Sequence, residues 1–444
     1  MKLNVKNTVF VGLVFLSISM FWQVYDNIVS KILAGTFGLD NAVRGIVMAL
    51  DNIVALFMLP LFGTLSDRSK RCRFGRRTPY IVVGTVLSAL TFVAVGASAD
   101  SGSFTAFMIT LCFTLVFMSV YRSPAVALMP DVTVKPLRSK ANAVINLMGA
   151  LGGLISLGLI AVMVKDGGAY LPLFGVVSGL MLLFLVLFLL LVKEPKLNAL
   201  REEDERRFNV ADDGRDENEG TEKLGREKMR SMIFLLASVF LWFMAYNAVT
   251  SSFSVYAQEV WGIADGSFSL PLMVAQVAAI AMFIPVGLVA SRIGRKKTIL
   301  IGIAVMFVSF FAAFFVGSNL FGVKIDLSEG SVLSNPMFYV MAVFFALCGV
   351  GWATINVNSY PMVVEMSKGS TVGKFTGYYY TASMAGQIAT PFLSGLLMDA
   401  VGMESLFMYA AAFMLLAFLT MILVFHGDSK PLPKKSRLEN FDAD

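Results

Sequence analysis

The most informative part of the sequence runs from Gly63 to Pro79 and reads Gly-Thr-Leu-Ser-Asp-Arg-Ser-Lys-Arg-Cys-Arg-Phe-Gly-Arg-Arg-Thr-Pro. It carries a single acidic residue, Asp67, among many basic ones: Arg68, Lys70, Arg71, Arg73, Arg76 and Arg77. On either side lies an apolar run long enough to cross the ~30 Å hydrocarbon layer of a membrane as a helix. A short, strongly basic loop between two such helices is typical of the cytoplasmic side.

Comparable apolar runs recur along the whole chain. Hydrophobic residues make up 57% of it and charged residues 15%, whereas a soluble domain carries about 25% charged residues. Backbone polar groups inside a bilayer must be bonded within their own segment, so long apolar runs predict helices. We expect an all-α membrane protein with twelve membrane helices, at roughly residues 8–34, 42–65, 79–98, 104–129, 140–163, 169–192, 231–257, 269–290, 298–317, 336–361, 375–398 and 404–426.

Lysine and arginine are unevenly distributed between the predicted loops. Of the 36 lysines and arginines, all but five fall in segments on the side of the membrane that holds the N-terminus. The five exceptions are Lys31, Arg44, Arg122, Lys165 and Lys324. Because basic loops stay in the cytoplasm, we expect both termini there, and the net charge of +6 reflects topology rather than nucleic-acid binding. The first apolar run is too long for a cleaved signal peptide and is expected to remain as the first membrane helix.

One long polar stretch, residues 193–230, divides the chain nearly in half. Its mixed charge and low aromatic content predict a flexible cytoplasmic linker with some helix at its start. The expected domains are a six-helix bundle over 1–192, the linker 193–230, a second six-helix bundle over 231–428 and a cytoplasmic tail over 429–444.

The two halves echo each other in sequence. Gly63 to Arg68 followed by Gly75-Arg76-Arg77 is matched by Gly287 to Arg292 followed by Gly294-Arg295-Lys296. A stricter echo is a triplet spaced by nine residues in each half: Arg122, Asp131 and Lys140, then Asn356, Glu365 and Lys374. Parallel repeats of this kind are typical of transporters built from two related halves.

The Gly63–Pro79 loop resembles the signature loop of the major facilitator superfamily. Its Arg-Phe-Gly-Arg-Arg-Thr-Pro ending, together with Arg122-Ser-Pro and the following Ala-Leu-Met-Pro-Asp131, is similar to the branch of sugar–cation symporters: the sucrose–proton symporter family and the glycoside–pentoside–hexuronide symporters. The resemblance implies two pseudo-symmetric six-helix bundles, alternating access, and a sugar carried together with a cation.

The chain departs from one feature of that branch. Melibiose-permease-like members place paired acidic residues just before a proline late in the second helix as a sodium site. Here an apolar Phe-Met-Leu precedes Pro60, and the acidic residue is Asp51. The expected coupling ion is therefore the proton, with sodium left open. No metal site and no cofactor are expected, because the single histidine, His426, and the three cysteines show no ligand spacing.

Asp26 is the leading candidate for coupling, because a charge at the centre of a membrane helix costs about 2.5–3.5 kcal/mol and usually serves function. The other candidates of the first helix share its face or flank it: Gln23, Asn27, Trp22 and Tyr25. Carboxylate and amide groups hydrogen-bond sugar hydroxyls, aromatic rings pack on sugar C–H faces, and burial favours the protonated carboxyl group. The alternative is a structural pair of Asp26 with Lys31.

Two further charges lie in predicted membrane helices. Asp51 is either a second proton carrier or an interhelical hydrogen-bonding residue. Arg122 keeps its charge in proteins and needs a counter-charge. If it faces Asp26, protonation of the aspartate would release the arginine to bind substrate; the alternative is a structural pair of Arg122 with Asp131.

The candidates in the second half are uncharged and lie on the predicted seventh, tenth and eleventh helices. They are Tyr246, Asn247, Trp352, Asn356, Tyr379 and Gln387. This asymmetry predicts proton handling in the first half and substrate binding from both. For any one aromatic residue, helix packing is the alternative.

The basic loops are expected to gate the cytoplasmic side. The gating candidates are Gly63, Asp67, Arg68, Arg76, Arg77, Asp131, Lys140, Arg292, Glu365 and Lys374. The carboxylate of Asp67 can pair across that face or cap a neighbouring helix N-terminus. The alternative is that the basic residues serve topology alone.

The leading function is proton-coupled symport of a di- or oligosaccharide. The alternatives are proton-driven efflux of a drug or metabolite on the same fold, and a sensor or scaffold that has lost transport. An enzyme is not expected, because no nucleophile–base pair, metal set or phosphate loop is visible. The expected partners are a small sugar and the lipid bilayer, without nucleic acid, for a monomer in a bacterial inner membrane.

Overall fold

The computed structural model describes residues 3–69, 73–134, 137–207, 225–317, 332–366 and 372–427. Within these ranges the chain forms helices and no β-strand. Eleven of the helices are long and apolar enough to cross a membrane, so the chain is an all-helical, multi-pass membrane protein. Much of the predicted linker, 208–224, and the predicted tail, 429–444, lie outside the described residues.

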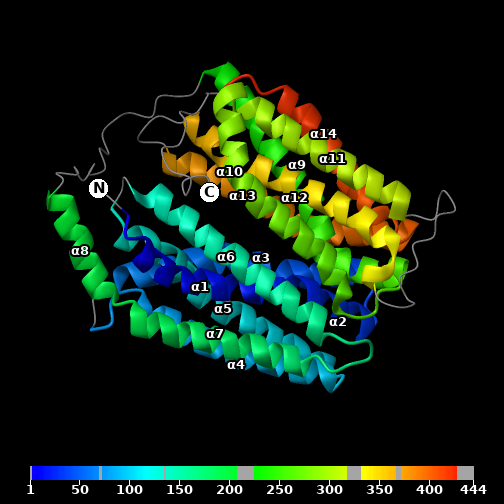
Figure 1. Cartoon of the computed structure of the whole chain (residues 1–444), viewed down its shortest axis with the longest axis horizontal. Coiled ribbons are helices and arrows are strands. Elements are labelled where there is room, and N and C mark those ends of the chain that lie inside the picture. Colours follow the sequence, from blue (N-terminus) through cyan, green and yellow to red (C-terminus); the bar gives the residue numbers. More distant parts are fainter. Residues whose placement is uncertain are drawn as a thin grey trace. The chain divides into compact units, whose positions relative to one another are not determined.

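The first of two compact units comprises Met1–Gly38 and Leu50–Asp212. Its first span is continuous through α1 (Val5–Val24), a π-helical turn η1 (Tyr25–Val29) and α2 (Ser30–Gly35). The other helices are α3 (Asn41–Arg68, from Leu50 onward), α4 (Thr78–Asp100), α5 (Phe104–Val132), α6 (Arg138–Met163), α7 (Leu171–Leu191) and α8 (Glu194–Arg207). Helix α1 packs on α6 and α7, and α4 packs on α5 and α7 (Figure 1).

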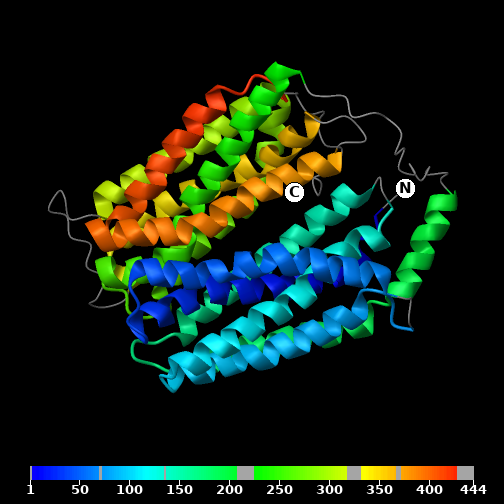
Figure 2. The ribbon, with the colours of Figure 1, turned by 180° about the vertical axis from the view of Figure 1, so that it is seen from behind.

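The second unit comprises Leu39–Ala49 and Asp213–Asp444. Its elements are α9 (Arg226–Trp261), η3 (Gly266–Phe268), α10 (Ser269–Ile293), α11 (Arg295–Gly317), η5 (Val332–Ser334), α12 (Pro336–Glu365), α13 (Val372–Val401) and α14 (Ser405–Ile422). Helix α9 packs on α13 and α14, and α11 packs on α12 and α14 (Figure 2). These pairs repeat the packing of the first unit, in agreement with the sequence echoes.

Two elements bear on the expected helix count. The linker begins with a helix, α8, as predicted. Helix α13 spans a predicted membrane segment but is not among the eleven apolar helices, because it is rich in Tyr, Ser, Thr and Gly. The count of twelve membrane helices therefore stays a prediction.

Glycines set the distance between α1 and α6. A Cβ atom added to Gly152 would lie 2.2 Å from the carbonyl oxygen of Leu16, and one added to Gly12 would lie 2.6 Å from Cγ of Met148. Backbones approach this closely only where side chains are absent. The close approach brings the polar stripe of α1 against α6: a Cβ on Gly153 would lie 3.5 Å from Cγ of Gln23.

Candidate functional site

Asp26 lies in the π-helical turn η1, within the first membrane span. Such turns are rare and recur at functional sites, because they disturb the regular order of side chains around a helix. Asp26 is half-buried, whereas its neighbours Tyr25 and Asn27 are buried. The π-helical turn therefore shifts the direction of the Asp26 side chain away from the one that a regular α-helical periodicity predicts.

Two buried polar atoms beside Asp26 have no hydrogen-bond partner among the described residues. Asn27 Nδ2 donates to the carbonyl oxygen of Gln23 at 2.9 Å, but Asn27 Oδ1 accepts no hydrogen bond. Trp22 Nε1 donates none. Because a buried polar atom without a partner costs about 1–3 kcal/mol, one acceptor and one donor are available here for a polar ligand.

Arg122 lies against the first membrane span, beside Trp22. Its Cζ atom is 5.3 Å from the centre of the Trp22 ring, which is a cation–π distance. Its charge also acts on Asp26 and Asp51, and the two carboxyl groups act on each other. Asn52 Nδ2 donates to Asp51 Oδ1 at 2.7 Å. The structure thus brings together the three ionisable groups that the sequence placed in membrane helices.

The second unit contains a stacked aromatic pair. The rings of Tyr246 in α9 and Trp352 in α12 lie face to face, with centroids 3.7 Å apart and planes at 5°. Phe243 meets the Trp352 ring edge-on at 5.4 Å. Tyr246 and Trp352 are both half-buried, so this pair keeps accessible surface, unlike Trp242, which is 1% exposed and belongs to the core.

The remaining second-half candidates bond within the helix bundle. Tyr379 is buried and shares a hydrogen bond of 2.9 Å with the hydroxyl of Ser359. The side-chain amides of Asn247 and Gln387 donate to carbonyl oxygens one turn earlier in their own helices. Asn356 is half-buried in α12. The geometry favours the packing role for Tyr379.

The loop between α3 and α4 is organised by Arg77, which is only 3% exposed. Its guanidinium pairs with Asp67, donates to Asp131 Oδ2 at 2.8 Å, and donates to Ser66 Oγ at 2.5 Å. Arg76 donates to the same oxygen of Asp131 at 2.8 Å, and this hydrogen bond raises the pKa of Arg76 above its usual value. Two aspartates and two arginines of the predicted gate therefore form one cluster.

The second unit repeats part of this cluster. Glu365, the counterpart of Asp131, pairs with Arg295 at 2.8 Å. Arg76 and Arg295 each directly follow a glycine with positive φ, Gly75 at +105° and Gly294 at +94°, a conformation that side chains rarely adopt. Both units therefore place an ion-pairing arginine at the same position after a glycine turn.

The other gating candidates are placed less centrally. Arg68 and Arg292 are exposed, and the arginine that pairs with Glu365 is Arg295. Gly63 lets α3 approach α5, since a Cβ there would lie 3.0 Å from the hydroxyl of Ser123. The side chains of Lys140 and Lys374 lie outside the described residues.

We expect Arg77→Ala to lower the stability of the first unit by about 3 kcal/mol, because it removes a buried guanidinium that pairs with Asp67 and with the half-buried Asp131. Thermal unfolding of the detergent-purified protein would measure this. Arg68→Ala, an exposed arginine of the same loop, is the matched control and should unfold like the wild type. Equal unfolding midpoints for the two variants would contradict the role given to Arg77.

Arg44 is a charged residue whose burial the sequence did not predict. The sequence groups it with outside loops, yet it is 1% exposed within the second unit. Its Nη2 donates to Ser252 Oγ at 3.3 Å, and Nη1 has no partner among the described residues. The charges of Glu259 and Asp399 act on it. In the sequence Arg44 is a single arginine near the start of an apolar run, and this pattern does not predict that its side chain is buried.

The beginning of α3 is fixed on α13. Asp399 accepts hydrogen bonds from the first two backbone N–H groups of α3, at 2.9 and 2.8 Å, and so caps that helix. A Cβ on Gly45 would lie 2.0 Å from the carbonyl oxygen of Pro391, and one on Gly395 would lie 2.4 Å from that of Asn41. Contact this close requires glycine on both helices.

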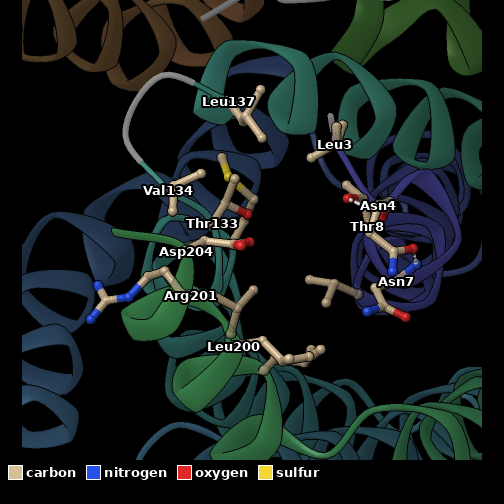
Figure 3. A pocket seen from close by; sticks show the side chains of 14 residues that line it. Leu3, Asn4, Asn7, Thr8, Thr133, Val134, Leu137, Leu200, Arg201 and Asp204 are labelled. Carbon is tan, nitrogen blue, oxygen red and sulfur yellow. Dashed lines mark hydrogen bonds between the residues drawn. The ribbon is translucent and has the colours of Figure 1, made fainter. Parts of the chain in front are cut away.

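A cavity of about 310 Å³ lies in the first unit, between the start of α1, the end of α5 and α8 (Figure 3). Apolar side chains such as Leu137 and Leu200 line it, together with the polar groups of Asn7, Thr133 and Asp204. It includes none of the residues predicted to bind substrate. Within the described ranges, no group of three or more His, Cys, Asp or Glu side chains could hold a metal ion.

The family model of the Major Facilitator Superfamily matches residues 11–325 and 320–441. The chain belongs to this superfamily and is a membrane transporter rather than an enzyme. Solved structures agree on the fold: the nucleoside transporter NupG and a bacterial homologue of the iron transporter ferroportin each superpose with a TM-score of 0.66. They cover 95% of this chain and 99% of their own, at 15% and 13% identity.

Curated relatives match shorter stretches. Sucrose transport protein SUC3 of Arabidopsis thaliana is 27% identical over 139 residues, which is 27% of this chain and 23% of that protein. Sucrose transport protein SUT1 of Oryza sativa subsp. japonica is 39% identical over 67 residues, 15% of this chain and 12% of its own. A protein of Agrobacterium vitis with a provisional tartrate-transporter name is 30% identical over 159 residues, covering 35% and 33%.

Proposed function

We propose that this protein is a symporter that carries a di- or oligosaccharide together with a proton by alternating access. The observation that carries the proposal is the cluster in the first unit. There Arg122 lies against the indole ring of Trp22 and its charge acts on the carboxyl groups of Asp26 and Asp51. Two buried polar atoms beside Asp26 have no hydrogen-bond partner among the described residues. The partial similarity to sucrose transporters supports a sugar as substrate.

The chemistry of the cluster suits coupling. A carboxyl group in a partly buried site can take up and release a proton, whereas an arginine cannot. With Asp26 charged, Arg122 has a nearby counter-charge; with Asp26 protonated, the guanidinium is freed to donate to sugar hydroxyls. The unpaired Asn27 Oδ1 and Trp22 Nε1 supply an acceptor and a donor for the same hydroxyls.

The proposal includes a topology of twelve membrane helices, with α13 as the most polar one and both termini in the cytoplasm. The positively charged loops support this orientation. Polar groups on α13 are tolerated in a transporter because such helices line a hydrated path rather than lipid. We place the chain as a monomer in a bacterial inner membrane.

In this topology the Arg76–Arg77 cluster lies on the cytoplasmic side and the Asp399 cap of α3 on the opposite side. Alternating access requires contacts on each side that form and break in turn. The loop cluster and the α3–α13 contact are the two sets of contacts that suit this role. The first combines ion pairs with close packing at Gly75, and the second combines the carboxylate cap of Asp399 with close packing at Gly45.

The proposal is tested by uptake into proteoliposomes that contain the purified protein. Labelled mono-, di- and trisaccharides are offered with and without an inward proton gradient. Gradient-driven accumulation of a di- or trisaccharide is the expected result. A lack of uptake of every sugar by folded protein would refute the sugar assignment, and faster efflux of a preloaded drug under the opposite gradient would favour the antiport alternative.

A small organic acid is the second candidate substrate. The tartrate-transporter match covers more of this chain than the sucrose-transporter matches do. Arg122 can donate hydrogen bonds to a carboxylate of the substrate as well as to a hydroxyl group. Labelled tartrate therefore belongs in the same uptake panel, and competition between tartrate and sucrose would show whether they share a site.

We expect Trp352→Ala to raise the KM for the transported sugar about 10-fold, because stacking on an aromatic face contributes about 1 kcal/mol or more. Trp352→Phe keeps a ring beside Tyr246 and should raise KM less. Initial uptake rates over a range of sugar concentrations measure both. An unchanged KM in the folded alanine variant would assign the stacked pair to helix packing alone.

A further inference from the structure

Glu194 is the first residue of α8, which begins shortly after the last span of the first unit, α7, ends at Leu191. Despite its charge it is 1% exposed. Its carboxylate accepts hydrogen bonds from the backbone N–H groups of Arg76 at 2.7 Å, Arg77 at 3.0 Å and Thr78 at 2.9 Å. The hydroxyl of Thr78 donates to it as well, at 2.8 Å. One buried carboxylate therefore satisfies four donors of the α3–α4 loop.

The loop is shaped around this carboxylate. A Cβ added to Gly75 would lie 2.3 Å from Cδ of Glu194, closer than real atoms approach, and φ of Gly75 is +105°. Only glycine meets both conditions. The glycine of the Gly-Arg-Arg sequence thus makes room for a residue that lies more than a hundred positions later in the chain.

The carboxylate does the work of a helix cap. Helix α4 begins at Thr78, and its N-cap residue, Arg77, makes no side-chain capping hydrogen bond. The first N–H groups of a helix lack partners within it and carry partial positive charge, so a negative group there is favourable. By holding these N–H groups, Glu194 fixes the backbone from which Arg76 and Arg77 extend toward Asp131.

In the second unit the end of the last span contacts the basic loop through different residues. Lys296 follows Arg295 as Arg77 follows Arg76. It donates to the carbonyl oxygen of Ile422 at the end of α14, at 2.9 Å, and lies 5.0 Å from the ring centre of Phe425. The end of the last span again meets the basic loop, but through a lysine and an aromatic ring in place of a buried carboxylate.

We propose that Glu194 is a positioning residue for the gating loop: it orders Gly75–Thr78 so that Arg76 and Arg77 pair with Asp131, and it thereby ties the start of the segment between the two halves to the pairing state of the loop. This inference rests on the gating role given above. It assigns a function to the first residue of a segment whose composition predicts only a flexible linker.

Hydrogen–deuterium exchange of the purified full-length protein tests the positioning role without any substrate. Glu194→Gln keeps the shape of the side chain but offers one acceptor oxygen and adds an N–H group that faces donors. We expect amide exchange in peptides covering residues 75–78 to rise about 10- to 100-fold, as charge-assisted hydrogen bonds are lost. Glu203→Gln, an exposed glutamate of the same helix, is the control and should exchange like the wild type.

Two results of this experiment would overturn the proposal. Unchanged exchange at residues 75–78 in Glu194→Gln would show that the carboxylate does not order the loop. A uniform rise across all helices of the first unit would show a general loss of stability instead of a local one. Both results concern Glu194 alone, and neither depends on which substrate the protein carries.

Transport kinetics test the link to gating, with radiolabelled sucrose as the probe. We expect Glu194→Gln to lower the maximal rate of net uptake about 10-fold while KM changes less than about twofold, because loop order affects conformational steps and not the Trp22 cluster. In a protein that already carries Asp131→Asn, Glu194→Gln should cause little further loss of rate, since the effects of residues that act through one contact are not additive. Additive effects would overturn the link. Absence of sucrose transport by the wild type would exclude sucrose as the substrate, and the same comparison would then be made with the sugar that the uptake panel identifies.

Discussion

Asp26→Asn protein, reconstituted into liposomes, is expected to lose accumulation of sugar against its gradient while it still exchanges labelled for unlabelled sugar across the membrane. The amide keeps the size and hydrogen bonding of a protonated carboxyl group but cannot release a proton. It also removes the negative charge that acts on Arg122. Binding and reorientation of the loaded protein should persist, whereas coupling to the proton gradient should not.

The measurement compares gradient-driven uptake with equilibrium exchange for each variant. Asp166→Asn, an exposed aspartate outside the cluster, is the control and should retain both activities. Asp51→Asn is expected to show a partial loss, because Asp51 already accepts a hydrogen bond from Asn52. Accumulation by Asp26→Asn at the wild-type level would remove Asp26 from the coupling mechanism and leave Asp51 as the remaining carboxyl group of the cluster.

A second large effect is expected for Gly45→Leu. Its Cβ atom alone would lie 2.0 Å from the carbonyl oxygen of Pro391, so the beginning of α3 could no longer seat on α13. If this contact closes one side of the transporter, net uptake should fall more than about 10-fold, while sugar still binds from the side that can no longer close. Overpacking of this kind cannot be relieved by a rotamer change, because backbone atoms make the clash.

Binding of a labelled sugar to the detergent-purified variant, measured beside its uptake into proteoliposomes, separates the two effects. Gly158→Leu is the matched control, since a Cβ at Gly158 in α6 meets nothing within 4 Å. Retained uptake by folded Gly45→Leu would show that the α3–α13 contact need not form during transport. Loss of both binding and folding would assign the contact to stability alone.

The outline of this fold followed from local sequence features. Apolar runs, basic loops and the spaced triplets of the two halves predict helices, a repeat and a transporter without any tertiary information. The sequence also indicated that Glu365 contacts an arginine of the neighbouring loop, because Glu365 repeats the position of Asp131. The sequence pointed to Arg292 for this loop, whereas in the structure Arg295 pairs with Glu365.

Other features depend on contacts between residues far apart in the chain. No local pattern predicts that Glu194 caps α4 or that Asp399 caps α3, because a cap is defined by the three-dimensional position of the carboxylate and not by sequence spacing. Likewise, Arg44 is buried only because α9 and α13 cover it. These charges looked like ordinary loop residues in the sequence.

Local sequence features were sufficient to identify this protein as an all-helical membrane transporter with related halves. Membrane insertion selects helices by hydrophobicity and topology by charge, and both are local quantities. The sequence also singled out Asp26, Asp51 and Arg122, since a charge in an apolar run is visible in one dimension. The tertiary structure was needed to show that Arg122 acts on both carboxyl groups and lies against Trp22, and that Tyr246 stacks on Trp352, because packing brings separate helices together through shape rather than composition.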